Sequence, residues 1–265
     1  MPEVGHQIKL LDHGYISLVE CWGSDEGIVR AARMSTAKGF LGWGPKCKHC
    51  GVVGEVYKSY DCLKRVDDLE HEWVAGDEKL LKHLWDRQHS TPFEMAGISI
   101  EVKAPIVVLR EWMRHRTQSF SEMSARYIPL PDENYRPSPA DVLRRGTETT
   151  GNKQAQGTGA ELTESGVDAW LWQLSQAYEA AQKAYEFGLR VGVPKELARL
   201  SVPVARYSVM RVSANLRNWL AFLKLRCDTA AQQEIRQYAN TVAVIVKDRF
   251  PRTYEVSANS LGLPP

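Results

Sequence analysis

The sequence has few cysteines, no long apolar run and no signal-peptide pattern at its start. Its five cysteines are an odd number, which argues against a disulfide framework and favours a reducing compartment. The longest apolar stretches, "APIVVL" (104–109) and "VAVIV" (242–246), are far shorter than the roughly 20 residues that span a bilayer. The N-terminal "MPEVGHQIKLL" also lacks the layout of a signal peptide. We therefore expect a soluble, cytoplasmic protein.

The charges nearly cancel, and no common nucleotide-binding motif is present. The 34 Lys and Arg residues face 32 Asp and Glu residues. This balance excludes a global basic field of the kind that drives nonspecific nucleic-acid binding. Neither G-x-G-x-x-G nor a P-loop occurs, so a bound nucleotide has to be held by another arrangement. Any anion-binding function must therefore come from a local group of basic residues.

Hydrophobic periodicity predicts a mixed α/β (α+β) fold without a repeating βαβ unit. We expect one domain over 1–265, because no break in composition divides the chain. The strands are predicted as a hairpin over 8–23 that turns near Asp12, and as single strands over 96–105 and 205–215. The predicted helices are 24–36, 77–88, 105–116, 167–192, 194–202, 216–226 and 229–250, where Pro251 ends the last one.

Two segments look like insertions into this pattern. The segment at about 145–163 has almost no large apolar residues, which predicts a flexible surface excursion. The segment at about 38–76 contains "CKHCG", with the C-x-x-C turn of half a zinc site. A second such turn is absent, which favours reduced surface thiols over a metal site. The alternative zinc ligands are Cys47, Cys50 and Cys62 with one of His49, His71 and His83.

The segment "RHRTQSFSEMSAR" (114–126) combines three arginines with three serines. The interpretation that needs no ligand is a solvated helix end, where the helix dipole stabilises each cation by roughly 0.3–1 kcal/mol. The preceding "PIVVL" (105–109) suggests instead a buried helix, and buried arginines without anionic partners are costly. Guanidinium forks and hydroxyl groups together suit a phosphate. The segment therefore predicts a bound anion at Arg114, Arg116 and Arg126.

The same residues carry a resemblance to a known family. Arg114, His115 and Arg116, followed after seven residues by Ser124, resemble the signature of the flavin-dependent thymidylate synthases, the ThyX family. The resemblance extends in the same order through "RAARMS" (30–35), "HSTPFE" (89–94), "VKAPIVVLREWMRHR" (102–116), "SARY" (124–127), "VPKELAR" (193–199), "NLRNWLAFLKLR" (215–226) and "AQQEIRQYA" (231–239).

The resemblance implies a homotetramer of mixed α/β subunits, each with an antiparallel-rich sheet and flanking helices. The active sites then lie between subunits and bind FAD and dUMP. Methylenetetrahydrofolate supplies the carbon transferred to C5 of dUMP, and FAD reduced by NADPH supplies the hydride. No protein nucleophile attacks the pyrimidine in this scheme, so Ser124 is expected to donate a hydrogen bond. No nucleic acid, membrane or metal is implied as a partner.

The resemblance also assigns site residues. Arg226 matches the arginine that activates the pyrimidine, by stabilising negative charge on its O2, N3 or O4 edge. The implied dUMP-binding residues are Glu111, Arg114, Glu122, Ser124, Ala125, Arg126, Arg199 and Arg226. The implied FAD-binding residues are His89, Thr91, Arg114, His115, Arg116, Glu122, Asn215 and Arg217.

Three positions depart from the family pattern. Ala221 and Ala230 stand where a polar Asn or His is common near the flavin, and Glu111 replaces a common Gln. These changes bear on flavin and nucleotide recognition, so a C5 methylase or hydroxymethylase of another pyrimidine nucleotide, such as UMP, is the alternative function.

Two non-enzymatic interpretations remain. One is single-stranded nucleic-acid binding, in which Phe120 and Tyr127 stack on bases. The balanced charge and the separate matches at Arg199 and Arg226 argue against it. The other, a purely structural oligomer, leaves the arginines unexplained.

Overall fold

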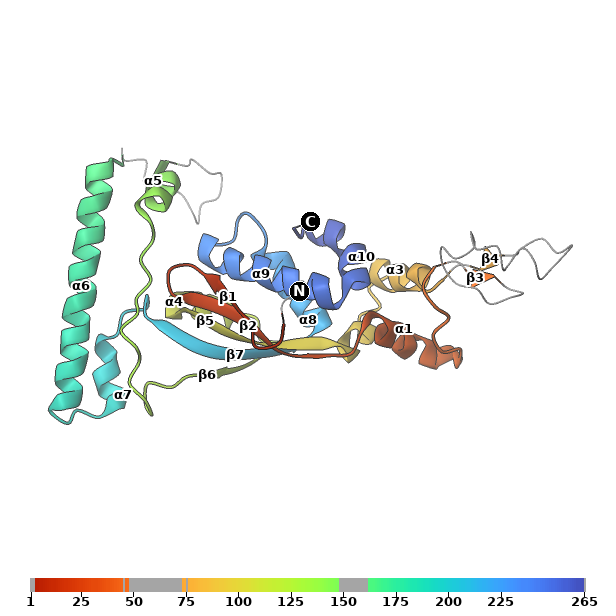
Figure 1. The fold of residues 1–265 in the computed structure, drawn as a ribbon, viewed down its shortest axis with the longest axis horizontal. Coiled ribbons are helices and arrows are strands. Elements are labelled where there is room, and N and C mark those ends of the chain that lie inside the picture. The colour runs from red at the N-terminus through yellow and green to blue at the C-terminus, as the bar shows by residue number, and fades with distance from the viewer. Residues whose placement is uncertain (1–2, 45, 48–72, 75, 148–161, 265) are drawn as a thin grey trace, which may run out of the picture.

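A computed structural model describes residues 3–44, 46–47, 73–74, 76–147 and 162–264. Its centre is a five-stranded antiparallel sheet with strand order β1-β2-β5-β7-β6 (Figure 1). The strands are β1 (Gln7–Leu10), β2 (Gly14–Trp22), β5 (Gly97–Pro105), β6 (Ser119–Glu122) and β7 (Tyr207–Asn215). Two short strands, β3 (Lys46–Cys47) and β4 (Trp73–Val74), pair separately. The predicted hairpin and both predicted single strands are confirmed.

Helices flank this sheet, as the sequence predicts. They are α1 (Asp25–Arg33), α3 (Glu78–Asp86), α4 (Ile106–Trp112), α5 (Pro139–Thr147), α6 (Glu164–Arg190), α7 (Lys195–Ala198), α8 (Leu216–Arg226), α9 (Gln233–Arg249) and α10 (Pro251–Leu261). Short 3₁₀ helices cover Met34–Thr36, Thr91–Met95 and Arg199–Ser201. Within the part of the chain that the structure describes, no helix combines the length and the apolar character needed to cross a membrane.

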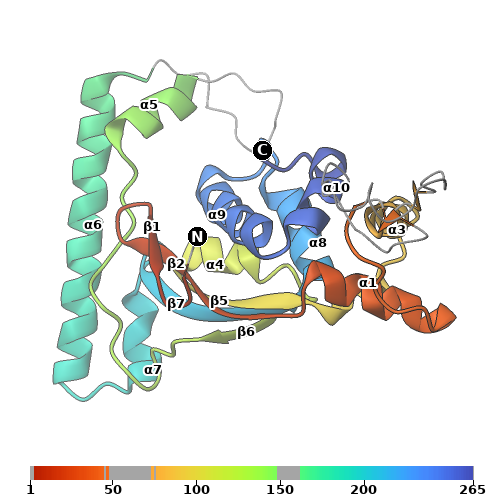
Figure 2. The same cartoon turned by 45° about the vertical axis from the view of Figure 1, so that its right-hand side comes forward.

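The hydrophobic core lies between one face of the sheet and the helices α4, α8 and α9 (Figures 1 and 2). Strand β5 contributes Ile98, Ile100 and Val102, which are fully buried, and α9 contributes Val242 and Ile245. Burial of each such side chain stabilises the fold by roughly 1.5–3 kcal/mol. The core therefore fixes α4 and α8, the two helices that carry site residues, against the same face of the sheet.

The segment after α4 differs from the prediction. The helix predicted over 105–116 ends at Trp112, and Arg114 lies in the turn that follows. Residues Ser119–Glu122 were expected in a loop but form β6, which pairs with β7 from Ser119 opposite Ser213 to Glu122 opposite Met210. Strand pairing with a distant segment is decided by tertiary contacts, which hydrophobic periodicity over a few residues does not report.

Two helices were missed in the sequence. Pro251 does not simply end α9, because it occupies the first turn of α10, where its missing N–H costs nothing. The buried carboxylate of Asp25 accepts hydrogen bonds from the backbone N–H groups of Arg252 (2.9 Å) and Thr253 (3.1 Å). Similarly, α5 begins at Pro139, and the preceding Ser138 caps it, because Ser138 Oγ accepts from the backbone N–H of Asp141 at 3.1 Å. Both starts depend on capping rather than on periodicity.

The two predicted insertions fall largely outside the described residues. Most residues of 38–76 and of 145–163 belong to this undescribed part, including Cys50 and Cys62. Of the cysteine cluster, only the backbone of Cys47, in β3, is described. The choice between free thiols and a zinc site therefore stays a prediction. In the described ranges, no three His, Cys, Asp or Glu side chains are grouped to hold a metal ion.

Candidate active site

Aromatic packing joins the end of α4 to α8. Trp112, which is fully buried, stacks on Phe222 with ring centroids 4.7 Å apart and meets Trp219 edge to face at 6.4 Å. Its indole N–H donates to Gln118 Oε1 at 2.9 Å. This contact fixes the last turn of α4 and the loop after it against α8, so neighbouring polar side chains of the two segments meet.

Three of the predicted site residues come together at this junction. Arg226, the last residue of α8, forms an ion pair with the carboxylate of Glu111 on α4. The same guanidinium donates through Nε to His115 Nε2 at 2.9 Å and through Nη2 to the backbone oxygen of Glu111 at 3.4 Å. The predicted activating arginine therefore lies beside the central histidine of the R-H-R motif, although the two residues are far apart in sequence.

The imidazole of His115 is neutral at pH 7. Burial, together with the nearby positive charge of Arg226, lowers the pKa of His115 to about 4. Because Nε2 accepts the proton of Arg226 Nε, the ring proton of the neutral form is on Nδ1. An edge-to-face contact with Phe222, 4.9 Å between centroids, holds the ring in place. The motif thus presents a neutral donor next to a paired cation.

The lowered pKa of His115 makes stability depend on pH. Between the folded pKa of about 4 and the ordinary value of about 6.5, the unfolded chain binds more protons than the folded chain. The contribution of His115 to the free energy of unfolding is thus fully present above about pH 6.5 and lost as the pH falls toward 4. We expect His115→Gln to reduce this loss in denaturant titrations at pH 5 and 7. A His115 proton resonance that titrates near 6.5 would contradict it.

The arginines of the basic segment are exposed, which contradicts the predicted burial. Arg114 and Arg116 lie in the turn after α4, and Arg126 follows β6. In the described part of the chain, the guanidinium groups of Arg114 and Arg116 make no hydrogen bond or ion pair, whereas that of Arg126 pairs with Glu196 at 3.4 Å. The helix ends before these side chains are carried into the core. An anion that binds this segment therefore meets exposed guanidinium groups rather than buried ones, and those of Arg114 and Arg116 have no partner among the described residues.

The segment after β6 is held by α7. Lys195 donates to the backbone oxygen of Tyr127 at 2.7 Å. Arg199, at the start of the 3₁₀ helix after α7, donates to the backbone oxygen of Glu196. The side-chain carboxylate of Glu196 pairs with Arg126. These contacts connect Arg126 and Arg199, two predicted nucleotide-binding residues, through one glutamate.

Other predicted residues of this segment lie close by in the chain. Glu122 ends β6 and is exposed, and Ala125 is buried. Ser124 Oγ accepts from the backbone N–H of Arg126 at 3.3 Å, which orders the loop. The serine hydroxyl proton is not used in that contact and is available to donate to a ligand.

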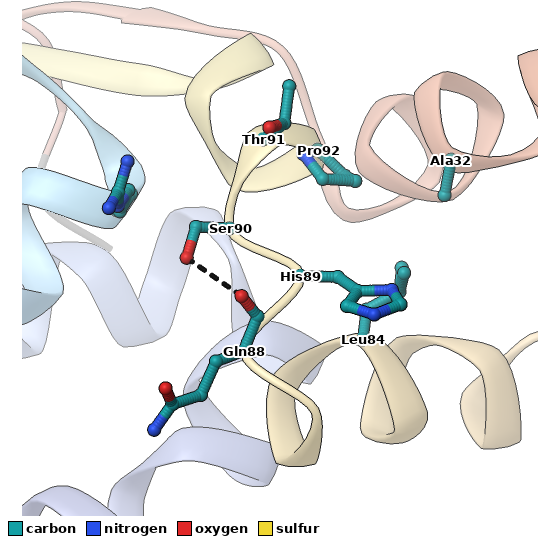
Figure 3. A pocket seen from close by; sticks show the side chains of 8 residues that line it. Ala32, Leu84, Gln88, His89, Ser90, Thr91 and Pro92 are labelled. Carbon is teal, nitrogen blue, oxygen red and sulfur yellow. Dashed lines mark hydrogen bonds between the residues drawn. The ribbon is translucent and has the colours of Figure 1, made fainter.

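Predicted flavin-binding residues surround a cavity of about 490 Å³ beside α8. His89, Thr91 and Arg217 all line it, together with Leu84 and Ala32, as Figure 3 shows for the labelled residues. His89 follows α3, which ends at Asp86, and Gln88 in the turn between them is in the left-handed conformation (φ 57°). The backbone N–H of His89 closes the helix by bonding to the oxygen of Leu84 at 2.8 Å.

Helix α8 connects this cavity to Arg226. Asn215 caps the helix by accepting from the N–H of Asn218 at 3.0 Å, and Asn218 Nδ2 donates to the backbone oxygen of Thr117 at 3.1 Å. Arg217 pairs with Glu94 on the 3₁₀ helix Thr91–Met95. At 1.5 Å per residue, Arg217 and Arg226 are separated by roughly 14 Å along the axis. One rigid element thus spaces the two groups of predicted residues.

Two of the three positions that depart from the family pattern, Ala221 and Ala230, lie on or near α8. Ala221 lines a second cavity of about 470 Å³, which shares His89 and Arg217 with the first. Ala230 is exposed in the loop after α8, and its N–H donates to Asp228 at 2.7 Å.

The structure does not bring all predicted nucleotide residues together within one chain. Arg199 and Arg226 share no contact, and α7 lies with α6 at one side of the molecule, away from α8 (Figures 1 and 2). Sequence reasoning also missed three residues that position the site, namely Glu94, Glu196 and Asn218. Each lies inside a segment that carries the resemblance, but a pairing partner is visible only in three dimensions.

The comparisons with known proteins identify close relatives. The model of the family described as thymidylate synthase complementing protein matches residues 17–252. A flavin-dependent thymidylate synthase of Wolbachia pipientis is 35% identical over 93% of this chain and 74% of its own length. The enzymes of that name from Thermosipho africanus and Thermus thermophilus are 33% and 37% identical, over 94% and 92% of this chain and 92% and 75% of their own lengths.

Among solved structures, the UMP/dUMP methylase PolB from Streptomyces cacaoi is similar in fold. Its complex with 5-Br UMP gives a TM-score of 0.71 at 27% identity, covering 97% of this chain and 99% of that chain. Its complex with 5-Br dUMP gives 0.72 at 29% identity, covering 97% and 100%.

Proposed function

Because this chain belongs to the thymidylate synthase complementing protein family, that of the flavin-dependent thymidylate synthases, we propose that it converts dUMP to dTMP by reductive methylation. Methylenetetrahydrofolate is the carbon donor, and NADPH reduces the FAD. The observation that carries the proposal is the meeting of Arg226 with His115 of the R-H-R motif at the α4–α8 junction. This places a fixed guanidinium and a neutral donor at an accessible edge of the protein.

In this proposal Arg226 binds the polar edge of the uracil ring. A guanidinium held by two neighbours needs no reorganisation as negative charge develops on the ring, which is how fixed donors lower a barrier. Arg126, Arg199 and Ser124 supply donors to the phosphate and sugar, with Ser124 as a hydrogen-bond donor and not a nucleophile. Arg114, Glu122 and Ala125 complete the nucleotide-binding set.

The residues beside α8 fit a dinucleotide cofactor. The cavity of about 490 Å³ is open to solvent at His89, Thr91 and Arg217, and its exposed guanidinium suits a pyrophosphate. Asn215, Arg114, His115, Arg116 and Glu122 complete the proposed FAD-binding set. FAD held there and reduced by NADPH would supply hydride to the pyrimidine. The alanine at 221 widens the adjoining cavity rather than adding a polar contact.

We also propose that the whole chain forms one catalytic domain of a cytoplasmic homotetramer. Several large apolar side chains on α6 and near α7 are exposed, including Trp172 (59%) and Leu200 (81%), which is typical of a surface covered by another subunit. Arg199 and Arg226 lie apart in one chain, so a second subunit supplies the phosphate-binding arginines of each site. This arrangement supports active sites formed between subunits.

A second candidate function is methylation of UMP. It is favoured by the likeness to PolB, whose printed name includes both UMP and dUMP. UMP carries a ribose 2′-hydroxyl that dUMP lacks. The carboxylate of Glu111, in the proposed nucleotide site, adds an acceptor that suits such a hydroxyl donor.

The assay that tests both functions offers dUMP and UMP in separate anaerobic reactions with FAD, NADPH and methylenetetrahydrofolate. We expect mass spectrometry to detect a methyl group gained by dUMP. Gain by UMP with little by dUMP would assign the second function instead. No methylated product from either nucleotide, with flavin bound, would contradict both.

A further inference from the structure

The guanidinium of Arg226 is largely committed to its own chain. An arginine carries five N–H groups. Three of them are directed at the Glu111 carboxylate, the backbone oxygen of Glu111 and His115 Nε2, so two remain for a ligand. Its side chain is 18% exposed, and that of Glu111 is 23% exposed. The Glu111–Arg226 pair is therefore mostly shielded from water but still reachable.

The charges at this junction cancel. In the described part of the chain, Glu111 and His115 are the titratable groups that contact the guanidinium, and both come from α4 and the turn after it. His115 is neutral because its pKa is lowered to about 4. The remaining pair of one carboxylate and one guanidinium has no net charge. Partial burial strengthens the attraction between the two, because less water screens it.

This cancellation bears on the site that we propose for the nucleotide. We propose that Glu111 is the counter-ion of Arg226 in the nucleotide site, so that the uracil ring meets a charge-compensated guanidinium rather than a free cation. The inference rests on the proposed function and adds a role for this residue. Glu111 is then a positioning residue that acts through Arg226, because it orients the guanidinium plane and reduces the field that the ring experiences.

A free cation and a charge-compensated one differ in their effect on the acidity of the N3–H group of uracil. A free guanidinium favours the ring that has lost this proton, whereas a neutral ion pair favours it less. Replacement of Glu111 by glutamine keeps the size and a hydrogen-bonding side chain but removes the negative charge. We therefore expect Glu111→Gln to make the bound ring more acidic.

The test measures the ionisation of 5-fluoro-dUMP bound to the flavin-containing protein, by ¹⁹F NMR across a pH series without folate. In Glu111→Gln, the N3 ionisation constant of the bound ligand should rise about tenfold over wild type, which is one pKa unit. Glu111→Ala is a second neutral variant with the same expected shift. Glu26→Gln, which removes a carboxylate paired with Arg30 on α1, is the matched control and should leave the constant unchanged.

The outcomes separate this inference from the function. If wild type, Glu111→Gln and Glu111→Ala all bind 5-fluoro-dUMP and the bound ligand has the same N3 ionisation constant in each, the counter-ion role is overturned. The proposed function then still stands. A folded wild-type protein that does not bind 5-fluoro-dUMP would overturn the proposed function, and this inference with it.

Discussion

Replacement of Arg226 by glutamine is expected to lower kcat with dUMP by about 10²–10³-fold, the usual cost of removing one fixed charge-stabilising donor. Glutamine retains a polar side chain but has no charge to stabilise the pyrimidine as electron density develops on its polar edge. The loss should appear in kcat more than in KM, because the contact strengthens in the transition state. Steady-state assays with saturating flavin and folate donor measure both constants.

Two further variants make this result specific. Arg30→Gln removes an exposed arginine from an i,i+4 pair with Glu26, and such pairs contribute little, so kcat should be unchanged. Arg226→Gln also leaves the Glu111 carboxylate without its partner. The double variant Glu111→Gln/Arg226→Gln removes that leftover charge and should still be severely impaired. A double variant with near wild-type kcat would show that Arg226 serves only to neutralise Glu111.

The second large effect concerns Trp112, the residue that joins α4 to α8. Trp112→Ala is expected to lower the free energy of unfolding by about 3–5 kcal/mol, the range for deleting a buried aromatic side chain. The indole is fully buried and contacts both Phe222 and Trp219, so its removal leaves a cavity that the two helices fill only partly. Chemical denaturation at one fixed protein concentration measures the change, because the homotetramer proposed above would add a concentration-dependent contribution to stability.

A matched variant separates packing from hydrogen bonding. Trp112→Phe keeps an aromatic ring on Phe222 but removes the N–H that donates to Gln118. We expect it to lose less than half of the stability lost in Trp112→Ala. Equal losses in the two variants, or a loss below about 1 kcal/mol in Trp112→Ala, would contradict the role assigned to the ring in the core.

The regular elements with strong local patterns were predictable. β5 carries apolar residues in alternation and was predicted over 96–105, one residue longer than the observed Gly97–Pro105, while α8 was predicted with its observed bounds, Leu216–Arg226. Such patterns reflect burial of one face of a local element, which neighbouring residues alone encode. The misses, β3, β4, β6, α5 and α10, are segments whose structure depends on a partner strand or on a cap.

The sequence by itself indicated the family, which the family match confirms, and it predicted most residues of the candidate site, because motif identity and spacing are properties of the chain in one dimension. It also placed His89, Thr91 and Arg217 in one group, and these residues line the same cavity. Only the tertiary structure decided that Glu111 and His115 contact Arg226, and that Arg114 and Arg116 are exposed. The physical reason is that charge pairing and burial depend on how distant segments pack, here on Trp112 holding α4 against α8.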